Sequence, residues 1–256
     1  MEIIIQPTAE QATSIAARII ARLVREKPKA VLGLATGSTP QKLYRRLADM
    51  RLDWRKVVTF NLDEYVGLAP TDERSYHKFM WNNLFDHVNI LKKNVNIPSG
   101  TAKNIPQLCR QYERKIRAAG GVDLQVLGIG TDGHIGFNES TSSLASRTRI
   151  KTLTEETRQA NAHFFGGHDE VPHHVITMGV GTIMESRQCL LLAFGEKKAR
   201  AVAAMVEGPI TSWVPASVLQ MHPQVTVCLD EAAAARLKKA EYYRWTYEHK
   251  PGWQRV

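Results

Sequence analysis

The chain has little of what marks secreted, membrane-spanning or metal-scaffold proteins. It has three cysteines in 256 residues, an odd number, set far apart in apolar contexts at Cys109, Cys189 and Cys228. Such thiols are typical of a reduced protein core and not of a disulfide or zinc framework. No apolar run approaches the roughly 20 residues that a bilayer-spanning helix needs, and the N-terminus lacks a basic stretch followed by a cleavage site. We therefore expect a cytoplasmic protein without a membrane partner.

Positive charge is in excess, but it is not arranged as in nucleic-acid-binding proteins. The formal net charge is +9, and Lys and Arg are scattered along the chain with a mild concentration over residues 236–255. A nucleic-acid-binding module needs a basic stripe with interleaved aromatic residues or a recognisable motif. A basic surface and a small anionic substrate explain the charge more simply, so we expect no nucleic-acid partner.

Apolar runs alternate with amphipathic helical patterns along most of the chain. The runs predict strands at 30–35, 57–62, 122–127, 175–178, 189–194 and 225–228. Helical periodicity and caps predict helices at 8–25, 39–50, 76–84, 106–119, 197–206 and 231–239. This alternation predicts an α/β fold with a single doubly wound, mostly parallel sheet and helices on both faces, similar to a Rossmann fold. We expect one domain over 1–256, with a tail from about residue 241 that the pattern does not assign.

Two of the predicted strands end in loops with chemically useful side chains. Thr36-Gly-Ser-Thr39 leads into a helix N-terminus, where amide groups and the helix dipole favour an anion such as phosphate. A tight turn with a cap is the plain structural alternative. Asp63 directly follows another strand, where burial can raise the pKa of a carboxyl toward that of a useful base, although aspartate also caps turns very often. Lys198, at a third strand-to-helix turn, is a second candidate anion contact or an ordinary surface lysine.

A third loop, Gly-Ile-Gly-Thr-Asp-Gly-His-Ile-Gly-Phe-Asn-Glu at 128–139, holds Asp132, His134 and Glu139 within twelve positions. An imidazole between two carboxylates suits acid–base catalysis. The loop also fits a dinucleotide-binding G-x-G-x-x-G, but no amphipathic helix follows and no acid ends a strand about 20 residues on. A metal site from the same side chains lacks a second histidine at ligand spacing. We expect neither cofactor nor metal, and we expect the three loops to meet at the carboxyl ends of the strands.

Four segments together resemble the glucosamine-6-phosphate deaminase family. They are Ala-Thr-Gly-Ser-Thr-Pro at 35–40, Phe-Asn-Leu-Asp-Glu-Tyr-Val-Gly-Leu at 60–68, the loop at 128–139, and Ser-Ser-Leu-Ala-Ser-Arg-Thr-Arg-Ile-Lys-Thr-Leu-Thr at 142–154. The resemblance runs from the first helix to about residue 240, with the motifs in family order and spacing. It implies isomerisation and deamination of glucosamine 6-phosphate to fructose 6-phosphate and ammonia, without a cofactor, and hence an amino-sugar phosphate as the small-molecule partner.

The resemblance also implies roles for individual residues. His134 would be the acid–base group that opens the pyranose ring, oriented and tuned by Asp132 and Glu139. Asp63 would be the base that moves the C2 proton to C1. The phosphate would be held by Thr36, Gly37, Ser38, Thr39 and Lys198.

Two positions depart from the family pattern. His163 stands where the pattern usually carries an arginine that grips the phosphate; a histidine is shorter, lacks the fork and is charged only at lower pH. Ser38 replaces a residue that is often glycine. Ser142, Arg149 and Lys151 match positions implicated in oligomeric, allosteric members activated by the N-acetylated substrate analogue, although surface caps and charges would look the same. The resemblance thus allows a homo-oligomer, and the tail leaves the oligomeric state open.

Two other functions share this type of sequence. The hydrolase 6-phosphogluconolactonase has a similar Gly-Asp-Gly-His segment but lacks the Phe-Asn-Glu continuation, so Glu139 favours the deaminase. Sugar-phosphate sensor domains of bacterial regulators usually carry a helix-turn-helix ahead of the domain. This chain enters its first core helix at about residue 8, so we expect no helix-turn-helix ahead of it.

Overall fold

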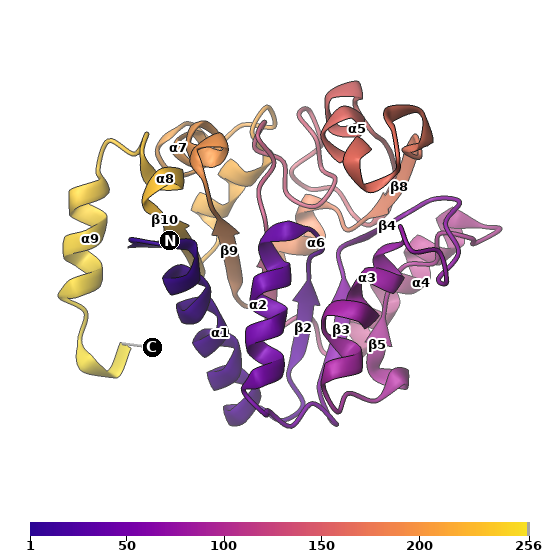
Figure 1. Ribbon diagram of the computed structural model, residues 1–256, viewed down its shortest axis with the longest axis horizontal. Helices are drawn as coiled ribbons and strands as arrows, with labels where there is room; N and C mark the ends of the chain where they lie inside the picture. The colour runs from indigo at the N-terminus through magenta and orange to yellow at the C-terminus, as the bar shows by residue number, and fades with distance from the viewer. Residues whose placement is uncertain (255–256) are drawn as a thin grey trace.

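A parallel sheet runs through the centre of the protein, whose computed structural model describes residues 1–254. Within these residues the sheet has seven strands in the order β1-β10-β9-β6-β2-β3-β5, and each neighbouring pair is parallel. The strands are β1 (Glu2–Gln6), β2 (Val31–Leu34), β3 (Val58–Asn61), β5 (Val95–Asn96), β6 (Leu124–Leu127), β9 (Cys189–Ala193) and β10 (Val225–Asp230). The carboxyl ends of β2 and β9 point toward the top of Figure 1.

Both faces of this sheet are covered by helices, because the strands are apolar on both sides. In β1, for example, Ile4 packs into one core cluster while Ile3 and Ile5 pack into the other. The first cluster is closed by α1 (Ala9–Glu26), α2 (Ser38–Asp49) and α3 (Tyr76–Asn83), and the second by α4 (Ile105–Ala118), α6 (Val180–Met184), α7 (Ala199–Glu207) and α8 (Glu231–Ala234). Strands buried on both faces are typical of doubly wound folds. The predicted fold class is confirmed.

A second, smaller sheet lies beyond the carboxyl ends of the parallel strands, and the sequence analysis did not foresee it. It is antiparallel, with β8 (His174–Thr177) between β4 (Asp63–Tyr65) and β7 (Arg149–Thr152). The predicted strand at 175–178 therefore belongs to this sheet and not to the parallel one. Its apolar side chains form a separate cluster around Tyr65, Phe137 and Val175. Helix α5 (Glu155–Asn161) follows β7, near the top of Figure 1.

The C-terminal tail forms a helix at one edge of the parallel sheet. The helix predicted over 231–239 ends earlier, at Ala234, and a separate helix α9 (Ala240–Glu248) follows. Helix α9 packs along the edge strand β1 (Figure 1), and Lys250 Nζ lies 2.6 Å from Glu2 Oε1. At the opposite edge, β5 has only two residues. Among the described residues, no helix is long and apolar enough to cross a membrane.

Candidate active site

The three loops singled out in the sequence converge on one cavity, as predicted. Strand order reverses between β2 and β6, which is where ligands bind in such sheets. The cavity there has a volume of about 400 Å³, and its walls include Thr36–Thr39, Asp63, residues 128–132, His134 and Lys198. Further wall residues come from the start of α3 and from the segment 156–165. Residues from opposite halves of the chain thus face one space.

The loop between β2 and α2 presents an open helix N-terminus to the cavity. Gly37 is the N-cap of α2 and has φ +112°, a conformation that side-chain-bearing residues rarely adopt. Glycine has no side chain that could accept a hydrogen bond from the first turn of α2, so the amide groups of that turn are left for a ligand. Lys198 lines the same cavity; burial lowers its pKa, and the charge of Asp132 opposes this. Amide donors, the helix dipole and an ammonium group make a suitable anion site.

Asp63 is the first residue of β4, and its carboxyl group is buried without a partner. The residue is 5% exposed, and among the described residues no side chain or amide donates a hydrogen bond to its carboxylate. Its Oδ2 lies close to Gly136, where an added Cβ would be 3.7 Å from it. Burial, reinforced by the charge of Glu64, raises the pKa of Asp63 to about 8. A carboxylate of this kind is a strong base once it has lost its proton.

His134 and Asp132 form a pair on the loop that follows β6. His134 Nδ1 lies 2.7 Å from Asp132 Oδ1, and the His134 backbone N–H donates to the same oxygen at 3.2 Å. Burial would raise the pKa of Asp132, but these contacts outweigh it and the pKa is lowered. The pair needs the small size of Gly130, where a Cβ would lie 2.3 Å from the imidazole ring. An ionised Asp132 therefore fixes one ring nitrogen of His134 and leaves the other for chemistry.

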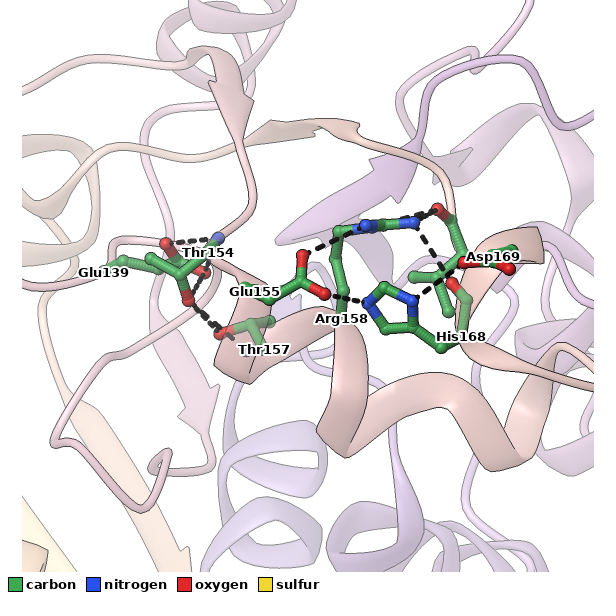
Figure 2. Close-up of polar contacts among 8 residues, drawn as sticks. Glu139, Thr154, Glu155, Thr157, Arg158, His168 and Asp169 are labelled. Atoms are coloured by element: carbon green, nitrogen blue, oxygen red, sulfur yellow. Dashed lines mark hydrogen bonds and ion pairs between the residues drawn. The ribbon is translucent and has the colours of Figure 1, made fainter.

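Glu139 makes its hydrogen bonds at the start of α5, and its role in orienting His134 stays a prediction. Its buried carboxylate accepts hydrogen bonds from the Thr154 amide at 3.0 and 2.9 Å and from Thr154 Oγ1 at 3.2 Å (Figure 2). Thr154 is the N-cap of α5, so the carboxylate lies at the positive end of that helix. Among the described residues, no three His, Cys, Asp or Glu side chains are gathered as a metal site would require.

The segment 154–172, which we call the roof segment, closes one side of the cavity. Thr157, Asn161 and His163 line the cavity, and the His163 ring lies 3.8 Å from that of Phe164. The segment is cross-linked internally by the buried Arg158, which donates to the carbonyl oxygens of His168 and Val171 at 3.1 and 3.3 Å (Figure 2). His163 thus lines the same cavity as Thr36–Thr39 and Lys198, and its contact with a phosphate stays a prediction.

The three residues matched to an activator site lie outside the cavity. Arg149 and Lys151 alternate along β7 and share one face of that edge strand. Arg149 Nη1 donates to Asn138 Oδ1 at 2.8 Å, which connects this strand to the neighbour of Glu139. Ser142 is buried, and its hydroxyl has no hydrogen-bond partner among the described residues.

Several cavity residues had escaped the sequence analysis. Tyr65 and Tyr76 form an aromatic wall in which the rings of Tyr76 and Phe137 stack at 6.1 Å and 8°, and Tyr76 Oη donates to Tyr65 Oη at 3.4 Å. Arg74 also lines the cavity, held by Asp72 at 2.9 Å. Tyr65 could have been predicted from the sequence, because it lies in the same Asp-Glu-Tyr segment as Asp63. Arg74 and Tyr76 had no such signal, because Arg74 lies in a polar stretch before α3 and Tyr76 is the first residue of that helix.

Comparison with known proteins identifies the relatives of this chain. The family described as glucosamine-6-phosphate isomerases/6-phosphogluconolactonase matches residues 6–228. A glucosamine-6-phosphate deaminase from Arthrobacter sp. (strain FB24) is 55% identical, with 99% of each chain covered, and one from Streptomyces coelicolor is 51% identical over the full length of both chains. The solved structure of a monomeric glucosamine-6-phosphate deaminase superposes with a TM-score of 0.91 at 45% identity, covering 92% of this chain and 100% of the other. A 6-phosphogluconolactonase from Thermotoga maritima has the same fold, with a TM-score of 0.71 at 22% identity, covering 90% of this chain and 98% of the other.

Proposed function

The chain belongs to the glucosamine-6-phosphate isomerase and 6-phosphogluconolactonase family, and we propose that the site described above deaminates an amino-sugar phosphate. The reaction converts glucosamine 6-phosphate to fructose 6-phosphate and ammonia by isomerisation and deamination. The observation that carries the proposal is the buried carboxyl of Asp63, which accepts no hydrogen bond from the described residues. It shares a cavity with the His134–Asp132 pair and the open N-terminus of α2.

The phosphate is bound by the backbone amides at Gly37 and in the first turn of α2, by the hydroxyl groups of Thr36, Ser38 and Thr39, and by Lys198. Binding the phosphate away from the reacting carbons fixes the sugar at little further entropic cost. His163 adds a contact from the roof segment. Its imidazole is shorter than an arginine side chain and lacks the pair of parallel N–H donors that a guanidinium offers to a phosphate.

His134 opens the ring by moving a proton between the C1 hydroxyl and the ring oxygen, and Asp132 keeps its imidazole in the working orientation. Asp63 then takes the proton from C2 and returns it to C1, which converts the aldose amine into a C2 imine. Addition of water at C2 and departure of the nitrogen as ammonia give the ketose phosphate. Each positioned acid or base supplies roughly 10²–10⁴ in rate.

Glu139 supports this site through Thr154 and not through the imidazole. Its carboxylate connects the loop that carries His134 to the N-cap of α5. We therefore assign it the role of holding the roof segment over the cavity. The lactonase reaction is disfavoured because hydrolysis of a lactone needs no base at C2, whereas Asp63 provides one.

The test is to incubate purified protein with glucosamine 6-phosphate without added metal and to assay ammonia and fructose 6-phosphate in equal amounts. Hydrolysis of 6-phosphogluconolactone without ammonia release would favour the related hydrolase. Tight binding of the sugar phosphate without turnover would favour the sensor. A cytoplasmic location, a homo-oligomer, and activation by an N-acetylated sugar phosphate at Ser142, Arg149 and Lys151 stay predictions from the sequence.

A further inference from the structure

A second buried carboxylate lies beside the base and has no role in the reaction so far. Glu64 is 2% exposed, follows Asp63 in β4 and is not part of the cavity wall. Its Oε1 accepts the backbone N–H groups of Tyr65 at 2.9 Å and Tyr76 at 3.0 Å, and its Oε2 accepts that of His77 at 2.9 Å. Tyr76 and His77 are the first two residues of α3. The carboxylate therefore occupies the positive end of that helix.

Strand alternation gives Asp63 and Glu64 different surroundings. Successive side chains of a strand point to opposite faces, so Asp63 and Tyr65 face the cavity while Glu64 faces the start of α3. One short strand thus holds the base on one side and the helix on the other. Tyr76, which lines the cavity from the first turn of α3, is positioned by the same carboxylate.

The electrostatic surroundings of Asp63 single out the same neighbour. Asp63 interacts electrostatically with Glu64 and with four buried phenols, which are those of Tyr44 from α2, Tyr65 from β4, Tyr76 from α3 and Tyr112 from α4. The four phenols are kept neutral, chiefly because burial raises their pKa values. Glu64 is the one carboxyl among these neighbours. Burial raises the pKa of Glu64 and the charge of Asp72 adds to this, whereas the three amides that donate to its carboxylate lower the pKa and favour the charged form.

We propose, on the basis of the deaminase function proposed above, that Glu64 is a positioning residue: its carboxylate fixes the first turn of α3 against the strand of Asp63 and keeps a negative charge beside the base. The charge makes Asp63 hold its proton to higher pH and makes it a stronger base. The anchor keeps Tyr76 in the cavity wall. Neither part requires Glu64 to touch the substrate.

The charge is tested by Glu64→Gln, measured through the pH dependence of kcat/KM. Removing one neighbouring charge should move the rising limb of the profile to lower pH by about 0.5–1 unit. The matched control is Ser75→Ala. Ser75 Oγ accepts the Lys78 N–H at 3.0 Å as the N-cap of α3, so the control loosens the same helix start and keeps the charge. Its rising limb should stay at the wild-type pH even if its rate falls.

The anchor is tested by Glu64→Asp, which keeps the charge but withdraws the carboxylate from α3. We expect a loss of roughly 10-fold in kcat/KM, as for a lost hydrogen bond to a charged group. A rising limb at the wild-type pH in Glu64→Gln would overturn the role of the charge. Wild-type rates in Glu64→Asp would overturn the role of the anchor. Should Glu64→Gln not fold, Glu64→Asp decides the proposal through its rate. Absence of ammonia release by the wild type would instead contradict the function itself.

Discussion

The amide nitrogen of Thr154 lies within 3.0 Å of both carboxylate oxygens of Glu139, so the last residue of the loop that carries His134 holds the N-cap of α5. This contact joins the chemistry of the cavity to the position of the roof segment. A change at Glu139 should therefore affect how the substrate is enclosed before it affects proton transfer by His134.

Glu139→Gln should raise KM more than it lowers kcat. A glutamine has one acceptor oxygen, so it cannot accept from the Thr154 N–H with two oxygens as the carboxylate does. Because hydrogen bonds to a charged group are worth about 1.5–3 kcal/mol, we expect KM to rise about 10-fold. Steady-state kinetics with glucosamine 6-phosphate measure this. Glu10→Gln, which removes an exposed pair with Lys42, is the control and should leave both constants unchanged. A loss confined to kcat, with a changed pH profile, would show that Glu139 acts on His134.

Asp63→Asn should abolish turnover and spare binding. Loss of the base that moves the C2 proton should lower kcat by roughly 10²–10⁴, while the phosphate site at α2 is untouched. Ammonia release measures the first effect, and calorimetric titration with fructose 6-phosphate measures the second. Near-normal turnover in this variant would remove Asp63 from the mechanism.

The raised pKa of Asp63 also predicts a pH-dependent stability difference between the wild type and Asp63→Asn. Because the folded pKa, about 8, lies above the unfolded value of about 3.9, the folded state holds the proton more tightly. The stability that the protonated carboxyl contributes is fully present below about pH 4 and is lost progressively up to about pH 8. Compared with the asparagine variant, the wild type should lose roughly 4 kcal/mol between pH 5 and pH 9 in urea unfolding, at about 1.4 kcal/mol for each pH unit up to 8. A pH-independent difference would contradict the burial argument.

His163→Arg should tighten phosphate binding. A guanidinium reaches further than an imidazole and offers two parallel N–H donors to the phosphate. We expect KM to fall about 10-fold. His173→Arg serves as the control, because this histidine is absent from the cavity wall. Equal effects in the two variants would argue for a general charge effect.

Gly130→Ala should damage catalysis and leave the fold intact. The added Cβ would lie 2.3 Å from the His134 ring and 2.5 Å from Asp132 Oδ1, so the pair must move apart. Because a small misplacement of a catalytic group can cost about 10² in rate, we expect kcat to fall by roughly that factor. Gly128→Ala, whose Cβ would meet nothing within 4 Å, is the matched control. Circular dichroism and a thermal melt check that both variants fold.

The convergence of the loops after β2, β3 and β6 could be predicted because apolar runs mark parallel strands and the ends of such strands meet. The second sheet could not: β4 has three residues, and its antiparallel pairing with β8 joins residues about 110 positions apart, which no local pattern encodes. The contact between Glu139 and Thr154 could not be predicted for a related reason. Thr154 is brought to Glu139 by β7, a strand of only four alternating residues.

Helix α9 has a consequence for solubility. An edge strand exposes unpaired N–H and C=O groups that can pair with another chain. At one edge of the parallel sheet, α9 lies along β1, and at the other edge β5 offers only two residues to such a partner. Helix α9 thus covers the edge strand β1 and hinders a strand of another chain from pairing with it. A chain shortened before Ala240 should keep its cavity but have a greater tendency to form intermolecular β-structure.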